Sequence, residues 1–190
     1  MLNHGASVAA NGGIAAVGLY EWRDVVGAML HVQGHDNLKN MSVGLFNLCA
    51  GGNAAMVAMT KRPELFEAVK AFVCPQPFSM NVAMKELAGL QGIGAFMDEL
   101  DQELVKLGGF KTAEMSPHHY AANVKVPAFI IQVRDDFWTQ PEDVQTTFDL
   151  LTIEDKKLFW IEGTNKRFDG YNYFGDNPAQ MIEFFDSHMK

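Results

Sequence analysis

The sequence has 190 residues, of which 48% are hydrophobic, and it carries a formal net charge of -8 with an isoelectric point near 5.1. This length fits a single domain with a substantial core, and the acidic balance argues against nucleic acid and anionic membranes as partners. The two cysteines, Cys49 and Cys74, give no disulfide framework. No basic n-region with an apolar core opens the chain, so the cytoplasm is the expected compartment.

Strands and helices are predicted to alternate along the chain. Residues 1–18 are rich in Gly, Ala and Asn and are predicted to form a loop. Apolar periodicity and the positions of Gly and Pro then predict the elements that follow. The predicted helices are 19–33, 52–61, 63–67, 82–90, 93–107, 142–151 and a last one with Asn177 as N-cap, and the predicted strands are 41–48, 68–74, 127–134 and 157–162.

Cys49 stands where strand 41–48 meets helix 52–61. A strand, a sharp turn and a helix with a nucleophile at the apex form the layout of a nucleophile elbow. The helix N-terminus favours a thiolate at this position, and the N–H of Ala50 is placed to donate to an oxyanion. Small residues two positions to either side, Asn47 and Gly51, would let strand and helix approach closely. The alternative is a buried cysteine at a strand end.

The segment Asn47-x-Cys49-x-Gly51-Gly52 resembles the G-x-S-x-G-G elbow of the α/β-hydrolase superfamily, and its cysteine is similar to that of the dienelactone-hydrolase-like branch. Asn47 departs from the usual glycine, although asparagine tolerates unusual backbone angles. The resemblance extends over the chain order of the elements. It implies an α/β, three-layer αβα fold with a mainly parallel, N-terminally shortened sheet, in one domain with a small helical cap at about residues 78–120.

The resemblance also implies a triad acid just beyond strand 127–134, and Asp136 matches that position. The alternative role for Asp136 is to cap the helix that follows. However, Thr139 and Glu142 already form a predicted capping box there.

The histidine of the triad should follow Gly163 by about three residues, and Lys166 stands in that position. No histidine occurs between Tyr120 and Ser187. Lys166 is therefore the third candidate catalytic residue, and either Lys166 or Arg167 would favour a thiolate at Cys49 electrostatically. His4, in a segment that resembles the superfamily's H-G-x-S motif, is a second stand-in.

Strand 41–48 would lie bare at the edge of a four-stranded sheet, and a bare apolar edge invites pairing with another chain. We therefore expect a homodimer through this edge. The resemblance implies hydrolysis of a small-molecule ester, lactone or thioester by a cysteine nucleophile. The alternative is an inactive hydrolase-fold domain used for binding or assembly, or the C-terminal part of a longer hydrolase. No cofactor or metal is implied, because no phosphate-binding loop or ligand cluster is present in the sequence.

Overall fold

The computed structural model describes residues 13–190, so His4 and its segment lie outside the described residues. Four parallel strands form one sheet in the order β1-β2-β3-β4. Seven α-helices accompany these strands in the described part of the chain. The strands are β1 (Val43–Phe46), β2 (Val69–Pro75), β3 (Ala128–Val133) and β4 (Lys156–Ile161), and the helices are α1 (Trp22–Gly34), α2 (Ala50–Lys61), α3 (Met80–Leu90), α4 (Met97–Gly108), α5 (Pro141–Leu150), α6 (Arg167–Asp176) and α7 (Ala179–His188).

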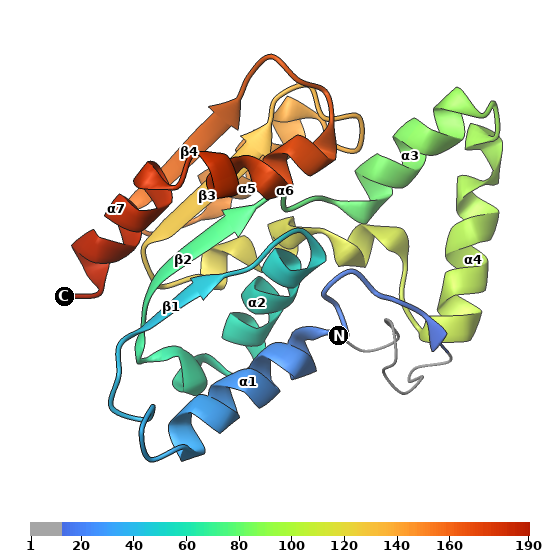
Figure 1. Ribbon diagram of the computed structural model, residues 1–190. Coiled ribbons are helices and arrows are strands. Elements are labelled where there is room, and N and C mark those ends of the chain that lie inside the picture. Colours follow the sequence, from blue (N-terminus) through green and yellow to red (C-terminus); the bar gives the residue numbers. More distant parts are fainter. Residues whose placement is uncertain (1–12) are drawn as a thin grey trace.

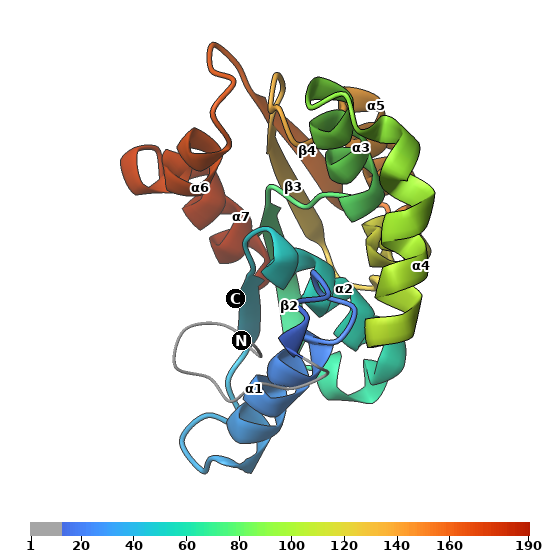
Figure 2. The same cartoon turned by 90° about the vertical axis from the view of Figure 1, so that its right-hand side faces the viewer.

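The helices cover both faces of the sheet, which gives three layers (Figures 1 and 2). Helices α1, α2 and α5 pack on one face, and α6 and α7 pack on the other. Strands β2 and β3 are almost wholly buried and read as continuous apolar runs, as strands covered on both faces do. The α/β, three-layer, mainly parallel architecture predicted from the sequence is confirmed.

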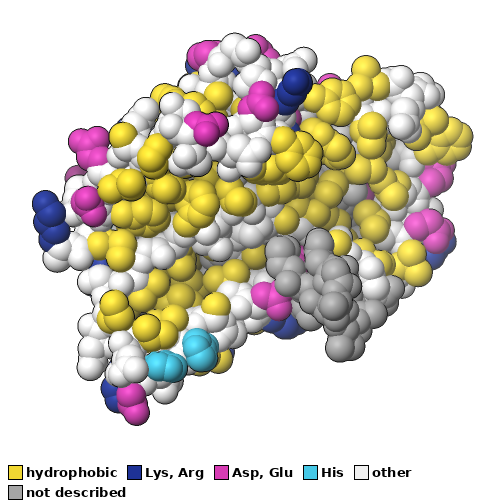
Figure 3. All heavy atoms as spheres, in the orientation of Figure 1, with side chains coloured by type: hydrophobic (Ala, Val, Ile, Leu, Met, Phe, Trp, Pro, Cys, Tyr) yellow, Lys and Arg dark blue, Asp and Glu magenta, His cyan; other side chains and the backbone are white. Residues whose placement is uncertain are grey.

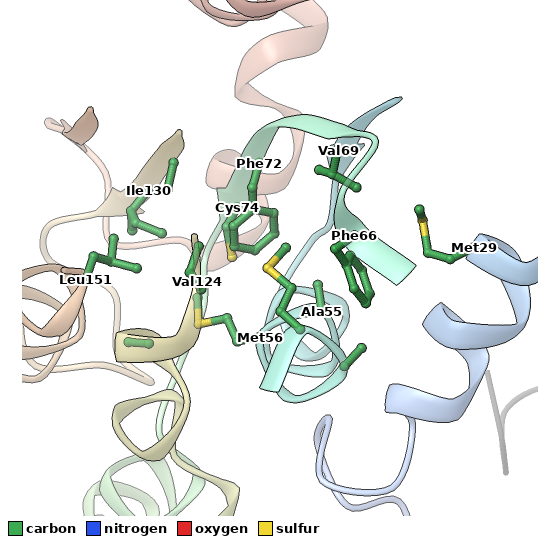
Figure 4. Packing of buried hydrophobic residues seen from close by; sticks show 14 of the residues in the cluster. Met29, Ala55, Met56, Phe66, Val69, Phe72, Cys74, Val124, Ile130 and Leu151 are labelled. Atoms are coloured by element: carbon green, nitrogen blue, oxygen red, sulfur yellow. The ribbon is translucent and has the colours of Figure 1, made fainter. Parts of the chain in front are cut away.

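The larger part of the core lies between the sheet and helices α1, α2 and α5 (Figure 4). Met56 of α2 and Phe72 of β2 are fully buried there, beside Cys74. Helix α2 consists largely of small residues, which lets it lie close against the strands. As a result, its N-terminus is held firmly at the carboxyl end of β1.

The insertion between β2 and β3 contains helices α3 and α4, which stand as a hairpin beside the main body (Figure 1). Short 3-10 turns connect α4 back to β3. The inner side of the insertion joins a third apolar cluster, which includes Phe78, Phe110 and Met115 and contacts Cys49. Among residues 13–190, no helix combines the length and the apolar character that crossing a membrane requires.

Three local predictions differ from the structure. The predicted helix 93–107 is broken, because a 3-10 turn at Gly94–Phe96 precedes α4. Helix α6 was not predicted, since Gly170 and Gly175 lower its helical propensity. Helix α7 has Pro178, not Asn177, as its N-cap.

Candidate active site

Cys49 lies between β1 and α2 in a backbone conformation that few residues adopt. Its φ is +53° and its ψ is -124°, which costs a non-glycine residue on the order of 1–3 kcal/mol. Hydrogen bonds hold this conformation on both sides. The Cys49 N–H donates to the Pro75 carbonyl (2.9 Å), and the Cys49 carbonyl accepts from the N–H groups of Gly52 (2.9 Å) and Asn53 (3.2 Å). The side chain is partly exposed.

Gly52, rather than the residues two positions from Cys49, is where strand and helix approach most closely. A Cβ at Gly52 would come closer than 3.0 Å to Cys74 Sγ and would lie 3.1 Å from the Asn47 carbonyl oxygen. A Cβ at Gly51 would meet its nearest atom only at 4.0 Å. Asn47 does not belong to the residues with positive φ, so the tolerance of asparagine for unusual angles is not used there.

The N–H of Ala50 opens helix α2 directly after Cys49. It makes no hydrogen bond to any residue in the described range 13–190. An N–H at a helix N-terminus attracts negative charge, because the helix dipole adds to its own. Ala50 can therefore donate to an oxyanion that forms at an acyl carbon bound to Cys49.

Asp136 is buried beyond the carboxyl end of β3, and its carboxylate accepts hydrogen bonds from several groups. Gln132 Nε2 (3.0 Å), Trp138 N (3.0 Å) and Thr139 Oγ1 (3.4 Å) all donate to it. The predicted capping box is wrong: α5 has Gln140 as its N-cap without a side-chain hydrogen bond. The Thr139 hydroxyl turns toward Asp136 instead.

Arg167 connects Asp136 to Cys49. Its Nη1 forms an ion pair with Asp136 Oδ2, and its Nη2 donates to Cys49 Sγ at 3.6 Å. The side chains of Arg167 and Asp136 are 8% and 0% exposed, so water scarcely screens their interaction. Burial opposes the charge of the guanidinium, but the charges of Cys49, Tyr171 and Asp136 outweigh this effect and raise the pKa of Arg167.

Lys166 is not brought to this group of residues. It is exposed and serves as the N-cap of α6, where its backbone N–H donates to Thr164 Oγ1 (3.1 Å). The neighbouring residue, Arg167, is the first residue of α6 and turns inward. The cation beside Cys49 is therefore one residue further along the chain than spacing from Gly163 suggested.

Two further residues hold the guanidinium. Arg167 Nε donates to the Tyr171 hydroxyl at 2.6 Å, one helical turn along α6, and Arg167 Nη2 donates to the Gln76 carbonyl. Gln76 is buried just after β2, with φ at +58°. Its side chain accepts from Val133 N (3.3 Å) and donates to the Arg167 carbonyl (3.2 Å). Gln76 thus ties the ends of β2 and β3 to the start of α6.

Three residues of this site were not predicted from the sequence: Gln76, Gln132 and Tyr171. Gln132 had a usable signal, because a polar residue inside the buried run of β3 requires a partner. For Gln76 the only signal was its place at a strand end between two prolines. Tyr171 gave no signal, because helix α6 was itself not predicted.

No family model and no curated relative matches the sequence. Solved structures do match it. The esterase Pf2001 of Pyrococcus furiosus is 16% identical with a TM-score of 0.64, over 93% of this chain and 65% of the esterase. The monoacylglycerol lipase of Paleococcus ferrophilus is 16% identical with a TM-score of 0.63, over 99% of this chain and 81% of the lipase. The dienelactone hydrolase of Anabaena variabilis is 19% identical with a TM-score of 0.56, over 89% of this chain and 60% of the hydrolase.

These similarities establish that the chain has the α/β-hydrolase fold. They confirm, at the level of fold, the resemblance inferred from the order of elements in the sequence. The chain spans about two thirds of the length of the Pyrococcus esterase.

Proposed function

We propose that this protein is a hydrolase of small esters, lactones or thioesters with Cys49 as its nucleophile. The observation that carries the proposal is the buried Asp136–Arg167 pair, whose guanidinium lies 3.6 Å from the Cys49 sulfur. A thiolate is the nucleophilic form of cysteine, and a fixed guanidinium offers it a compensating charge. Asp136 acts as a positioning residue, since it contacts Arg167 and not Cys49.

The reaction would proceed through a thioester. The Cys49 thiolate attacks the acyl carbon, the carbonyl oxygen takes up negative charge, and the N–H of Ala50 donates to it. The bond to the leaving group then breaks. Water hydrolyses the thioester and regenerates the thiolate beside Arg167.

Arginine differs from histidine in one decisive respect, because a guanidinium keeps its protons at any physiological pH. Arg167 can hold a thiolate but cannot carry a proton to the leaving group. With Arg167 alone beside Cys49, the geometry favours substrates whose leaving group departs without a proton, as the thiolates of thioesters, activated phenolates and the enolates of enol lactones do. The same property favours the second candidate, a hydrolase-fold domain without activity.

Turnover of p-nitrophenyl acetate by the wild type, Cys49→Ala and Cys74→Ala tests the proposal. Cys74→Ala is the matched control, because Cys74 is the other cysteine and is fully buried in the core. We expect release of p-nitrophenol that Cys49→Ala abolishes and Cys74→Ala retains. Release that survives Cys49→Ala, or no release by the wild type, would overturn the proposal and leave the inactive domain.

The two cysteines should also differ in reactivity toward iodoacetamide. Cys74 is fully buried, and this burial raises the pKa of its thiol, with a further contribution from the charge of Cys49. Cys49 is partly exposed and contacts a cation. Mass spectrometry of the folded protein should find Cys49 labelled first. Equal labelling of both would contradict the assignment.

A further inference from the structure

The Tyr171 hydroxyl lies where the proposed reaction lacks a proton carrier. One guanidinium contacts both this hydroxyl and the nucleophile: Arg167 Nε donates to Tyr171 Oη at 2.6 Å, and Arg167 Nη2 donates to Cys49 Sγ at 3.6 Å. The Tyr171 hydroxyl and the Cys49 sulfur thus lie on the same guanidinium, one at Nε and the other at Nη2. The Arg167 guanidinium cannot give up a proton, whereas the Tyr171 phenol beside it can.

We infer that Tyr171 is a catalytic residue that gives a proton to the leaving group and later takes one from the attacking water. This inference rests on the proposed function. Two residues of α6 would then share the roles of the missing histidine: Arg167 supplies the positive charge, and Tyr171 supplies the proton that is transferred.

The proton balance closes over one cycle. In the first step the C–S bond forms, the bond to the leaving oxygen breaks, and that oxygen takes the Tyr171 proton. Arg167 Nε holds the resulting tyrosinate. In the second step the tyrosinate takes a proton from water as its oxygen attacks the thioester. The C–S bond then breaks, which restores the thiolate and the neutral phenol and releases the carboxylic acid.

The surroundings of Tyr171 change its acidity at the right stage. Burial raises the pKa of Tyr171, the Arg167 guanidinium lowers it, and the interaction with a negatively charged Cys49 raises it further. While Cys49 is a thiolate, the phenol therefore keeps its proton. Acylation removes the sulfur's charge, and the opposing effect of Arg167 remains. The phenol is thus more acidic when the leaving group needs a proton.

The charged and titratable groups that face Tyr171 are Arg167 and Cys49, and Asp136 lies behind the guanidinium. The aromatic ring of Phe168 meets the Tyr171 ring edge-on at 5.4 Å. The ring of Tyr173, also on α6, packs against the ring of Phe159, with 5.5 Å between the ring centroids. Among residues 13–190, the described contacts of Tyr173 do not include Cys49. Tyr173→Phe is therefore a matched control with the same chemical change on the same helix.

The test compares Tyr171→Phe, Tyr173→Phe and wild type on p-nitrophenyl acetate and on ethyl acetate. A p-nitrophenolate leaves without a proton, whereas an ethoxide requires one. We expect Tyr171→Phe to keep the initial p-nitrophenol burst, to lose about 10²–10⁴-fold in ethyl acetate turnover, and to accumulate acetylated Cys49. Tyr173→Phe should match wild type on both esters.

Equal losses of the burst and of ethyl acetate turnover in Tyr171→Phe would indicate a merely structural role and overturn the inference, as would no loss on either ester. A wild-type burst that depends on Cys49, together with either result, leaves the proposed function standing. Absence of that burst in the wild type overturns both. Thermal unfolding of each variant verifies that the comparison is made between folded proteins.

Discussion

Alanine at Gly52 is the perturbation whose cost the structure defines best. The new Cβ would lie closer than 3.0 Å to Cys74 Sγ and 3.1 Å from the Asn47 carbonyl oxygen. Both neighbours belong to strand ends that carry the site, and Cys74 is fully buried. Overpacking of this kind costs about 1–3 kcal/mol, which for a chain of this size lowers the melting temperature by about 2–4 °C per kcal/mol.

Gly51→Ala is the matched control on the same helix, because its Cβ would meet nothing nearer than 4.0 Å. Alanine is favoured over glycine within helices by up to about 1 kcal/mol, so Gly51→Ala should be neutral or stabilising. The two variants should thus change the free energy of unfolding in opposite directions, although they make the same substitution one residue apart.

Removing the sulfur should rescue Gly52→Ala. In the Gly52→Ala/Cys74→Ala double variant, the two Cβ atoms would be 3.7 Å apart, an ordinary contact. Cys74→Ala alone should cost about 0.5–1.5 kcal/mol, as other deletions of one buried heavy atom do. Urea unfolding of the four proteins measures the coupling, which we expect to be favourable by about 1–2 kcal/mol. Additive losses, or a Gly52→Ala no worse than Gly51→Ala, would refute the close approach of α2 to β2.

Three further expectations follow. Asp136→Ala should cost about 3–5 kcal/mol in urea unfolding, because it leaves the buried Arg167 guanidinium unpaired; a loss under about 1 kcal/mol would match only an exposed pair. Burial opposes the charge on His188, but its hydrogen bonds, chiefly with Asp155, outweigh this and raise its pKa. The stabilising effect of the charged His188 imidazole is complete below its pKa in the unfolded chain and is lost as the pH rises through its pKa in the folded protein. His188→Gln should therefore lower the free energy of unfolding by up to about 1 kcal/mol at pH 5.5 and by less at pH 8.5. The homodimer stays a prediction, and light scattering at micromolar concentration should give twice the mass of one chain. Phe46 on β1 is 44% exposed, and Phe46→Lys should give a monomer. A wild-type protein with the mass of one chain would contradict the prediction.

The surface beside β1 is consistent with that last expectation. Hydrophobic side chains gather on the face that β1 and α7 present in Figure 3. Phe46 and Leu48 are exposed at the end of β1, and Ile182 is exposed on α7. Within the sheet described here, β1 pairs with β2 only, so its other edge is unpaired in the described sheet.

Apart from α6, the order of strands and helices was predictable because the elements have a clear period or a clear apolar run. Strand β3 was recognisable as a buried parallel strand from its continuous apolar run, and β2 was recognisable as a strand from its alternation and apolar bias. Cys49 was predicted from the strand, turn and helix around it, and Asp136 from its match to the acid position that the resemblance implies. Both stand at strand ends, where a parallel sheet gathers its functional side chains. Such positions follow from chain topology and need no knowledge of side-chain packing.

The choice between Lys166 and Arg167 could not be made in this way. The two residues are adjacent cations at the start of α6, and only the start of that helix decides which one turns inward. Gly170 lowers the helical propensity of α6, which is one reason why the helix was not predicted. Packing also requires this glycine, because a Cβ there would overlap the side-chain amide of Gln76. Long-range packing of this kind leaves no periodic trace in the sequence.

The placement of the site at four strand ends has a consequence for how the chain folds. Arg167 meets Asp136, Gln76 and Cys49 across separations of 31, 91 and 118 residues. Contacts between such distant residues form slowly, since the loop between them must first be closed. The guanidinium can be buried only once β4 has joined the sheet, so its contact with Cys49 should be among the last to form. During refolding, the appearance of the native reactivity of the Cys49 thiol would then report when the last strand has joined the sheet.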